Sequence, residues 1–555
     1  MSIIPTTTSD GTPILILKEG SSQTKGRDAK RNNIMAARLV AEIVKTSLGP
    51  RGMDKMLVDT LGDVTITNDG AALLKEMDIQ HPAGKMMVEI AKSVDNEVGD
   101  GTTSSVVLAG ALIGNAEELI NQDVHPTIIV DGYRKASIKA IEILNKIAEE
   151  VGPNDKKTLA KIANTAMQSK LVSDDSPYLS DLAVDAVLGV AEKIGDTYRI
   201  DIDDIKVEKK AGGSIKDTKL INGIVLDKEV VHGGMPKRVE NAKIALLNSP
   251  LEIEKTEFDA KINIDSPEKM KMFLDEENRI LQAMVDKIVA SGAKVIVCQK
   301  GVDDIAQHYL AKAGVVAVRR SKESDMTKLS KATGGRVVTN IEDLTEEDLG
   351  TAGLVEERKV ETDKWVFIEG CKNPKALTML VRGGSQRVVD EAERSIHDAL
   401  MVVKDVMEKP SIVAGGGAPE AYLATELKTW SNKLSGREQL AAQKFAEALE
   451  TIPLTLGENA GMDPIDTMTE LRAKQSKGSK WSGIDVRELK ITDMMRKDIL
   501  EPLSVKEQII KSATETASMI LRIDDVIAAA KSRAPAGPPG GPGGGGMGGM
   551  GGMEY

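Results

Sequence analysis

The sequence predicts a multidomain α+β protein that is mostly helical towards both ends, with an α/β domain inserted between them. A chain of 555 residues is too long for a single hydrophobic core and favours roughly three or four domains. Ala- and Met-rich stretches with helical periodicity dominate both ends, whereas the middle alternates between short apolar strands and helices. Because chain termini usually lie on one domain, an α/β segment between helical ends indicates an insertion.

The helical ends are predicted from apolar side chains that recur on one face. In residues 32–47, Ile34, Leu39 and Ile43 lie on the same helical stripe. Comparable helices are predicted over residues 102–122, 131–149, 418–450 and 505–519.

The middle of the chain predicts a parallel βαβ arrangement. Residues 293–299 have the pattern of a buried strand, residues 301–314 that of a helix, and residues 315–320 that of a second strand. Segments 324–334 and 335–340 repeat the helix–strand step. Strands that alternate with helices in this way are typical of a parallel sheet.

Residues 262–292 predict one long amphipathic helix. Ser266 suits the N-cap and Pro267 the first helical position. About 25 residues give a helix of roughly 37 Å, so its N-terminal turns are expected to project beyond a small domain. The alternative is an ordinary amphipathic core helix. If the turns project, an apolar and adaptable tip would comprise Met270, Met272, Phe273 and Leu274.

Three further segments predict strands with edges that need partners. Residues 55–67 predict a hairpin, and residues 12–20 and 520–527 predict strands near the two chain ends. Pairing between neighbouring subunits would cover these edges, and pairing within one subunit is the alternative. The Gly- and Pro-rich residues 533–555 predict a disordered, flexible tail.

The composition predicts a soluble, acidic protein. Hydrophobic residues make up 41% of the chain, and the formal net charge is −12. The acidic balance argues against nucleic-acid binding, which normally needs a basic face. No apolar run approaches the ~20 residues of a membrane span, and the first residues lack a signal-peptide pattern. Cys298 and Cys371 are too far apart to suggest a disulfide framework, so we expect a cytoplasmic protein with no membrane partner.

Three stretches near the N-terminus predict one phosphate-binding site. Residues 46–55 end a helix in a Gly-Pro turn, which leaves backbone N–H groups free. Residues 64–74 and 98–107 each predict a strand that leads into a helix through an Asp-Gly pair. Helix N-termini present unpaired N–H donors and a partial positive charge, which suit phosphate oxygens. The alternative is that Asp69 and Asp100 are simple helix N-caps.

The Asp-Gly pairs also predict a bound metal ion. A carboxylate beside phosphates is favourable mainly as a magnesium ligand, since its bare charge would repel them. The hydroxyls of Thr102, Thr103 and Ser104 add donors directly after Gly101. No GxxxxGK[ST] motif occurs in the chain, which excludes an ordinary P-loop.

These and later motifs resemble those of the group II chaperonins. The resemblance covers residues 10–530 and rests on TSLGPRGMDKML, TITNDGAALL, GDGTTSSVVLAG, VAGGGAPE and EPLSVKEQ, in that order. It implies ATP and Mg²⁺ as cofactors and non-native polypeptides as substrates. It also implies a cytoplasmic double ring of identical or paralogous subunits.

The resemblance further implies three nested domains. A mostly helical equatorial domain would bind ATP, a small intermediate domain would act as a hinge, and an inserted α/β apical domain would bind substrate. A helical protrusion of the apical domain, about residues 251–290, would form a built-in lid. The implied bounds are 1–152 and 404–532 for the equatorial domain, 153–222 and 370–403 for the intermediate domain, and 223–369 for the apical domain.

The matched motifs imply roles for single residues. Asp398 would position or deprotonate the attacking water, with Asp69 as its partner across the γ-phosphate, while Asp100 would bind Mg²⁺. Lys170 resembles a lysine of the intermediate domain that senses the γ-phosphate. A carboxylate base is reasonable because orienting the water matters more here than basicity. The other implied nucleotide contacts are Ser47 (where relatives often have Thr), Leu48, Gly49, Pro50, Gly101, Thr102, Thr103, Ser104, Gly416, Asn459, Ala460 and Glu501.

The sequence therefore predicts an ATP-driven chamber that binds non-native chains and folds them after closure of its lid. Two other functions stay open. A metal-dependent phosphotransferase with a mobile α/β lid would be stimulated by a small-molecule acceptor. A passive holdase would use the Met-rich tip alone, and its activity would not depend on Asp398.

Overall fold

The computed structural model describes residues 4–7, 13–16, 22–195, 197–253, 266–372 and 376–528. They fall into two compact units, a small one made of residues 1–33 and 523–555 and a large one made of residues 34–522. Among the described residues, no helix combines the length and the apolar character that a membrane crossing requires.

In the small unit, strands near the two chain ends form two antiparallel pairs. β1 (Ile4–Thr7) pairs with β2 (Pro13–Ile16), and β3 (Ser22–Lys25) pairs with β23 (Asp525–Ala528). Both pairings join segments of this chain, and pairing of the remaining strand edges with a neighbouring subunit stays a prediction.

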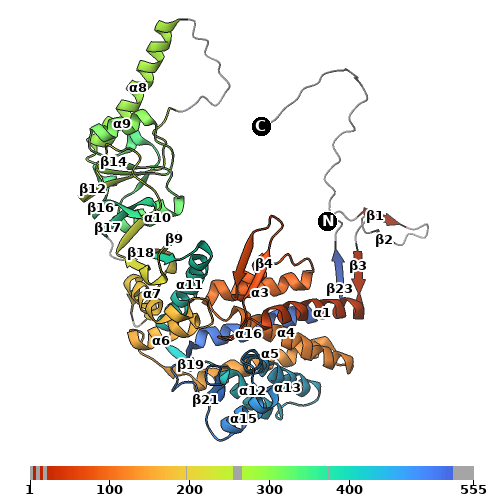
Figure 1. Ribbon diagram of the computed structural model, residues 1–555. Coiled ribbons are helices and arrows are strands. Elements are labelled where there is room, and N and C mark those ends of the chain that lie inside the picture. Colours follow the sequence, from red (N-terminus) through yellow and green to blue (C-terminus); the bar gives the residue numbers. More distant parts are fainter. Residues whose placement is uncertain are drawn as a thin grey trace, which may run out of the picture. The chain divides into compact units, whose positions relative to one another are not determined.

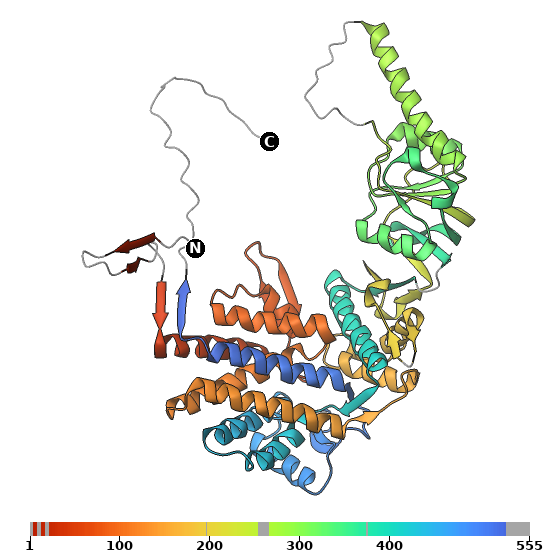
Figure 2. The same cartoon turned by 180° about the vertical axis from the view of Figure 1, so that it is seen from behind.

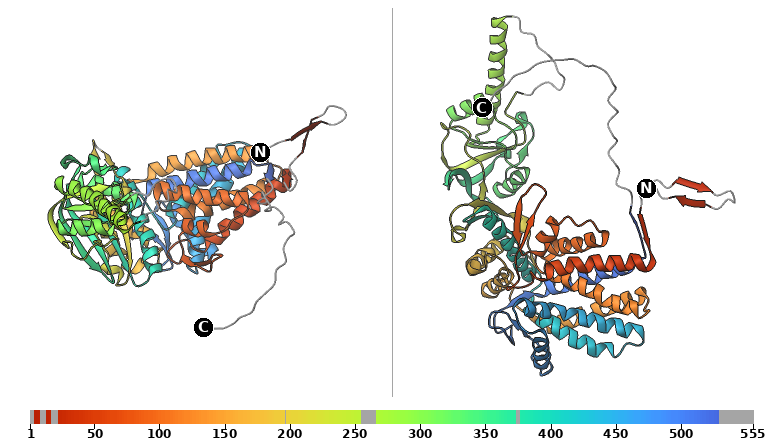
Figure 3. Two further views of the ribbon diagram at one scale, coloured as in Figure 1. Left: turned by 90° about the horizontal axis from the view of Figure 1, so that it is seen from above. Right: turned by 45° about the vertical axis from the view of Figure 1, so that its right-hand side comes forward.

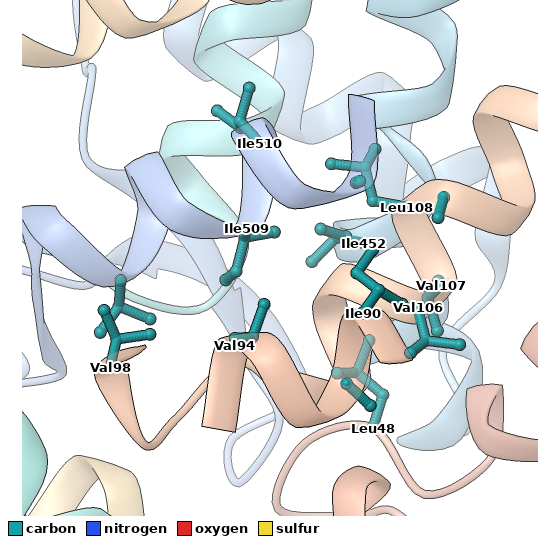
Figure 4. Packing of buried hydrophobic residues seen from close by; sticks show 14 of the residues in the cluster. Leu48, Ile90, Val94, Val98, Val106, Val107, Leu108, Ile452, Ile509 and Ile510 are labelled. Carbon is teal, nitrogen blue, oxygen red and sulfur yellow. The ribbon is translucent and has the colours of Figure 1, made fainter. Parts of the chain in front are cut away.

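The large unit contains a bundle of long helices from both sides of the insertion. α1 (Gly26–Lys45) enters it, and α16 (Leu503–Leu521) packs against α3 (Pro82–Val98), α4 (Thr102–Asn121) and α5 (Pro126–Ile147) (Figures 2 and 3). α4 is rich in Ala, Gly, Val and Ser, so neighbouring helices approach it closely and most of its residues are buried. Figure 4 shows how apolar side chains of these helices meet in one core, among them Val94, Leu108, Ile509 and Ile510.

Two predicted elements at this end of the chain have different bounds in the structure. The helix predicted over 418–450 is two helices, α12 (Ala418–Ser431) and α13 (Arg437–Leu449), because the chain turns at Gly436 with φ +66°. The strand predicted over 520–527 starts only at Asp525. Ile520 and Leu521 are instead buried in the last turn of α16.

Shorter elements complete this helical region. α2 (Gly70–Glu76) follows the predicted hairpin, which is formed by β4 (Lys55–Val58) and β5 (Val64–Thr67). α14 (Thr451–Asn459) and α15 (Pro464–Ser476) follow α13. The remaining short strands are β6 (Glu149–Glu150), β19 (Ser411–Ala414) and β22 (Leu500–Pro502), which form one sheet, and β20 (Ser482–Asp485) with β21 (Lys490–Asp493), which form a hairpin.

A second group of elements combines three helices with a small sheet. α11 (Gln386–Glu408) packs against α6 (Lys156–Met167) and α7 (Ser176–Val190). The sheet has the order β10-β18-β9, in which β18 (Leu377–Gly383) lies between β9 (Ile205–Ala211) and β10 (Lys219–Ile221). β7 (Glu192–Ile194) and β8 (Thr197–Arg199) form a separate hairpin.

The middle of the chain forms a seven-stranded sheet with its own hydrophobic core. β12 (Arg238–Leu247), β13 (Val295–Cys298), β14 (Val316–Val318) and β15 (Val337–Val338) pair in parallel, and α9 (Asp304–Lys312) and α10 (Glu323–Thr333) connect them. The predicted βαβ arrangement is therefore confirmed. The sheet is extended by antiparallel strands, namely β11 (Gly223–Leu226), β16 (Gly350–Val360) and β17 (Asp363–Cys371).

The long helix α8 (Pro267–Ala290) has two different halves (Figure 1). Ser266 caps it by accepting from the Lys269 amide, as predicted. Leu281, Val285 and Ile288 of its C-terminal half are buried against the sheet. The predicted tip is exposed, with Met270 at 50% and Met272 at 70%, so the N-terminal turns project as expected. Residues 254–265 of the predicted protrusion lie outside the described residues, as does the predicted tail.

Candidate nucleotide site

A cavity of about 360 Å³ lies where segments from distant parts of the sequence meet. Its walls come from the turn after α1, the start of α4, the end of α6, the loop before α12 and the segment that begins α16. Most known small-molecule sites have volumes of roughly 300–1,000 Å³. The cavity therefore has the size of a ligand site, and it contains several of the predicted residues.

The turn Leu48–Pro50 forms one wall. Gly49 has φ +80°, and a Cβ there would lie 2.3 Å from Leu456 Cδ2, so only glycine fits this turn without strain. The side-chain amide of Asn459 donates to the carbonyls of Lys45 (3.1 Å) and Leu48 (2.9 Å). The predicted turn is thus present, and Asn459 braces it from behind rather than lining the cavity.

The start of α4 forms the second wall. Gly101 is the N-cap with φ +81°, and no side chain caps the helix. A Cβ on Gly101 would lie 2.6 Å from Ile509 Cδ1. The start of α4 therefore lies at the cavity without a side-chain cap, and uncapped helix N-termini suit an anion.

The segment before Asp100 is not the strand that the sequence predicts. It is the helix α3 rather than a strand, and α3 ends at Gly99 with φ +71°. A strand is excluded because Val94 and Val98 point into the same core at helical spacing (Figure 4). Asp100 is also no N-cap. Its Oδ1 accepts from the neighbouring Gly101 amide at 2.6 Å.

Two carboxylates from opposite ends of the chain meet at one buried lysine. The Lys170 Nζ lies 3.0 Å from Asp69 Oδ1 and 3.2 Å from Asp398 Oδ2. All three side chains are at most 10% exposed. Asp69 stands at the start of α2, Lys170 follows α6, and Asp398 lies on α11. Asp69 and Asp398, which are far apart in the sequence, therefore lie close together at Lys170.

The surroundings shift the pKa values of Asp398 and Asp69 in opposite directions. Burial raises the pKa of Asp398 well above its usual value, and Asp69 and Asp100 add to this, while Lys170 lowers it only in part. Burial alone would also raise the pKa of Asp69. The Lys170 ammonium and the Ala72 N–H outweigh that effect, so the Asp69 pKa is lowered. Burial would likewise lower the Lys170 pKa, but Asp69 and Asp398 hold it well above its usual value.

A further part of the cavity wall consists of a glycine loop and residues of a second charged cluster. Gly416 has φ +65°, and a Cβ would lie 2.8 Å from Met494 Cε. The Lys506 Nζ lies 2.6 Å from Glu501 Oε2 and 2.7 Å from Glu420 Oε1. Burial raises the pKa of Glu501, and Lys506 opposes that rise. In this part of the wall a ligand can therefore lie close to the backbone at Gly416, and Glu501 can accept a hydrogen bond from it.

Known proteins resemble this chain over most of its length. The TCP-1/cpn60 chaperonin family matches residues 40–531. Thermosome subunit alpha of Archaeoglobus fulgidus is 57% identical over 533 residues, covering 96% of this chain and 98% of that one. The thermosome subunit of Methanopyrus kandleri is 59% identical over 520 residues, covering 94% and 95%. The chain belongs to the TCP-1/cpn60 chaperonin family.

A solved structure shows the same fold. The open-state monomer of a group II chaperonin from Methanococcoides burtonii aligns with a TM-score of 0.60 at 46% identity, covering 77% of this chain and 100% of that one. The mixed α+β, multidomain chaperonin fold and the resemblance to group II chaperonins are therefore confirmed. This chaperonin chain also carries every predicted site residue within the segment that the family matches.

Not every predicted nucleotide contact lines the cavity of this chaperonin. Leu48, Gly49 and Pro50 line it, as do Asp100, Gly101, Ser104, Gly416 and Glu501. Ser47 is buried and donates to the Val44 carbonyl at 2.7 Å. Thr102 lies 3.5 Å from Asp69, and Thr103 contacts Gly70. The residues outside the lining are Ser47, Asp69, Thr102, Thr103, Lys170, Asp398, Asn459 and Ala460.

Sequence reasoning missed several polar residues of the cavity. Lys506 belongs to a quoted motif, but nothing in that motif marks it as the partner of two buried carboxylates. Asp485 accepts from the Arg487 and Glu488 amides at 3.0 Å, a turn that the pattern Asp-x-x could have indicated. Gln168 could have been found only through its position next to Lys170.

A further acidic cluster among the described residues is no metal centre. Oxygens of Glu208, Asp227 and Asp325 lie within 4.8 Å of one another. The Lys206 ammonium is 2.8 Å from Glu208 and 2.6 Å from Asp325. A lysine therefore already supplies the positive charge at that place.

Proposed function

We propose that this chain is an ATP-hydrolysing subunit of a double-ring folding chamber. The observation that carries the proposal is the meeting of Asp69 and Asp398 at Lys170, beside a cavity with an uncapped helix N-terminus. Family membership supports the same function.

The described residues fit a magnesium-bound triphosphate. Gly49 and Gly101 leave room where a Cβ would clash, and the uncapped start of α4 offers N–H donors. Asp100 accepts one short hydrogen bond, from Gly101, and is only half-buried. Asp100 would hold Mg²⁺, which would neutralise phosphate charge when bound.

The charged triad fits the hydrolysis of ATP. Because burial raises the Asp398 pKa, its carboxylate is a stronger base than an exposed aspartate and can take a proton from water. Asp69 stays ionised, and its position is fixed because it caps α2 through the Ala72 amide at 2.8 Å. Lys170 binds both carboxylates and so fixes their relative position, and it would also contact the γ-phosphate. Since Lys170 follows α6, such a contact would link hydrolysis to movement of that helix.

The domain organisation follows as part of the proposal. Residues 1–152 and 404–532 would form the equatorial domain, residues 153–222 and 370–403 the intermediate domain, and residues 223–369 the apical domain. The separate hydrophobic core of the seven-stranded sheet, from Ile224 to Ala376, supports the inserted apical domain. Neighbouring subunits, identical or paralogous, would complete a ring in the cytoplasm.

The exposed half of α8 is proposed to bind non-native polypeptides. Met270, Met272, Phe273 and Leu274 are each at least 44% exposed. Flexible methionine surfaces repack around many different apolar partners. Replacing Met272 and Phe273 with serine should weaken capture of an unfolded client while leaving basal ATP turnover unchanged.

The test compares purified wild type with Asp398→Ala. We expect the variant to bind ATP but to hydrolyse it at least about a hundredfold more slowly, and to lose refolding of a denatured client. Asp405→Asn is the matched control, because Asp405 is also a buried carboxylate of α11 but bonds only to Ser504. Negative-stain images with and without ATP would show ring formation and closure.

Other outcomes would overturn the proposal. Equal hydrolysis by Asp398→Ala and wild type would remove the assigned base. ATP turnover that rises with a small metabolite, and not with unfolded protein, would indicate a phosphotransferase. Refolding that survives loss of turnover would indicate a holdase.

A further inference from the structure

Strand β5 ends at Thr67, and Thr67 and the two polar residues that follow it each contact a different partner. Thr67 Oγ1 donates to Glu391 on α11 at 3.3 Å and accepts from the Asp69 amide at 3.1 Å. The Asn68 side-chain amide donates to the backbone carbonyl of Ser169. Asp69 Oδ1 accepts a hydrogen bond from the Lys170 ammonium. One short stretch therefore contacts both α11 and the loop that carries Lys170.

The orientation of Asn68 is set by a single contact. Its side chain is only 8% exposed, and its Oδ1 has no hydrogen-bond partner among the described residues. A carbonyl can only accept, so the end of the amide that faces Ser169 must be the NH₂ group. Leaving a buried amide oxygen unpaired is unfavourable. The Asn68 side chain therefore binds the Ser169 carbonyl, although this leaves its own Oδ1 unpaired among the described residues.

Holding the Ser169 carbonyl fixes the backbone immediately before Lys170. The Lys170 amide donates to the Met167 carbonyl at 3.1 Å, and the Ser173 amide donates to the Lys170 carbonyl at 3.0 Å. Lys170 therefore sits in a tight turn, and the contact to Asn68 joins that turn to β5. From this position its ammonium reaches Asp69 and Asp398 together.

We propose that Asn68 is a positioning residue of the ATPase site that acts through Lys170. It holds the lysine loop against β5, so that the ammonium and the two carboxylates keep their arrangement. Asn68 does not line the cavity and contacts no reacting group. The proposal rests on the proposed ATPase function and adds a residue to it.

A double-mutant cycle tests the proposal. Asn68→Ala removes the donor, and Asn68→Asp removes it while keeping the side-chain shape. Each should lower kcat about tenfold and change KM for ATP by less than about threefold, because the lysine is misplaced while the cavity walls stay. In a Lys170→Ala background, Asn68→Ala should lower kcat by less than about twofold more. The same factor in both backgrounds would show a merely structural role and overturn the proposal.

The matched control is Asn115→Ala. Asn115 also donates its side-chain amide to a backbone carbonyl, that of Lys444 at 2.9 Å, but it lies between α4 and α13. Its loss should leave kcat unchanged.

Amide hydrogen exchange provides a second, independent measurement. Residues 166–173 should exchange faster in Asn68→Ala and at the wild-type rate in Asn115→Ala. Unchanged protection in Asn68→Ala would overturn the proposal, even if Lys170→Ala does not turn over ATP. A wild-type protein without ATPase activity would instead refute the proposed function.

Discussion

Two buried clusters in this chaperonin chain each contain one lysine and two carboxylates, but their surroundings differ. Lys170 lies between Asp69 and Asp398, and Lys206 lies between Glu208 and Asp325. Every side chain of both clusters is at most 11% exposed. The first cluster adjoins a cavity with an uncapped helix start. A buried lysine with two carboxylates therefore does not identify a site, and the adjoining cavity makes the difference.

The Lys206 cluster joins two sheets. Lys206 and Glu208 lie on β9 of the small sheet, Asp325 lies on α10, and the ammonium also donates to the Val225 carbonyl on β11 at 2.6 Å. The Lys206 ammonium is thus surrounded by protein acceptors, as expected for a structural ion cluster.

The largest expected effect is on stability and comes from Lys206→Met. The substitution leaves two buried carboxylates without their cation, which should cost about 3–5 kcal/mol of unfolding free energy. Urea unfolding at a fixed protein concentration measures this. ATP turnover per folded molecule should stay unchanged.

Neutralising the partners provides the control. Combining Lys206→Met with Glu208→Gln and Asp325→Asn should recover most of the lost stability, because no buried charge remains. The structural role of the Lys206 cluster would be contradicted if Lys206→Met abolished ATP turnover and left the unfolding free energy unchanged.

The next largest effect concerns Asp405, a buried carboxylate that forms no ion pair with another described residue. Its Oδ2 accepts from the Ser504 hydroxyl at 3.1 Å. Burial raises its pKa to about 7, whereas an unfolded aspartate has a pKa of about 3.9. The folded chain therefore keeps the proton between these values, and this group contributes stability that is full below about pH 4 and is lost as the pH rises to about 7.

Asp405→Asn should remove that pH dependence. The unfolding free energy of the variant should match that of wild type near pH 4 and exceed it at pH 8 by on the order of 4 kcal/mol. Urea unfolding across this pH range measures the difference. A constant difference at all pH values would show that Asp405 is ionised throughout. Asp398, on the same helix, differs because it forms an ion pair with Lys170 at 3.2 Å.

Gly101 tests the cavity that distinguishes the Lys170 cluster. Gly101→Ala places a Cβ 2.6 Å from Ile509 Cδ1 at φ +81°, so KM for ATP should rise at least about tenfold. Gly292→Ala is the matched control, because Gly292 has φ +85° and a Cβ there would meet no other atom within 4 Å. Both variants should lose stability because of their positive φ, and Gly101→Ala should lose more because its Cβ also clashes. Only Gly101→Ala should change KM, measured in steady-state ATPase assays.

Local sequence could predict the walls of the site but not the contacts across it. Gly49 and Gly101 were identifiable because a turn and a helix start need positive φ there. Asp69 was identifiable as an N-cap for the same local reason, and it is one. The meeting of Lys170 with Asp398 depends on packing between α6 and α11, which only family resemblance could suggest.

The wrong predictions have equally physical causes. The helix predicted over 418–450 runs through Gly436 because apolar periodicity resumes on both sides of the turn. The residues before Asp100 predict a strand because valines and glycines occur there, although α3 is an amphipathic helix whose valines are buried. Asn459 fits equally well as a nucleoside contact or as a brace for a turn, and sequence cannot give the direction of its amide.

The smallest expected effect comes from an exposed cluster in which one carboxylate lies between two lysines. Glu142 lies 2.8 Å from Lys139 and 2.5 Å from Lys146 on the surface of α5. Hydrogen bonds from Lys139 and Lys146 lower the pKa of Glu142 to about 2, yet its side chain is 48% exposed. Water and salt screen such pairs, so Glu142→Gln should leave the thermal midpoint unchanged within error in scanning calorimetry. A loss as large as that of Lys206→Met would show that the number of partners, and not burial, sets the stability of these clusters.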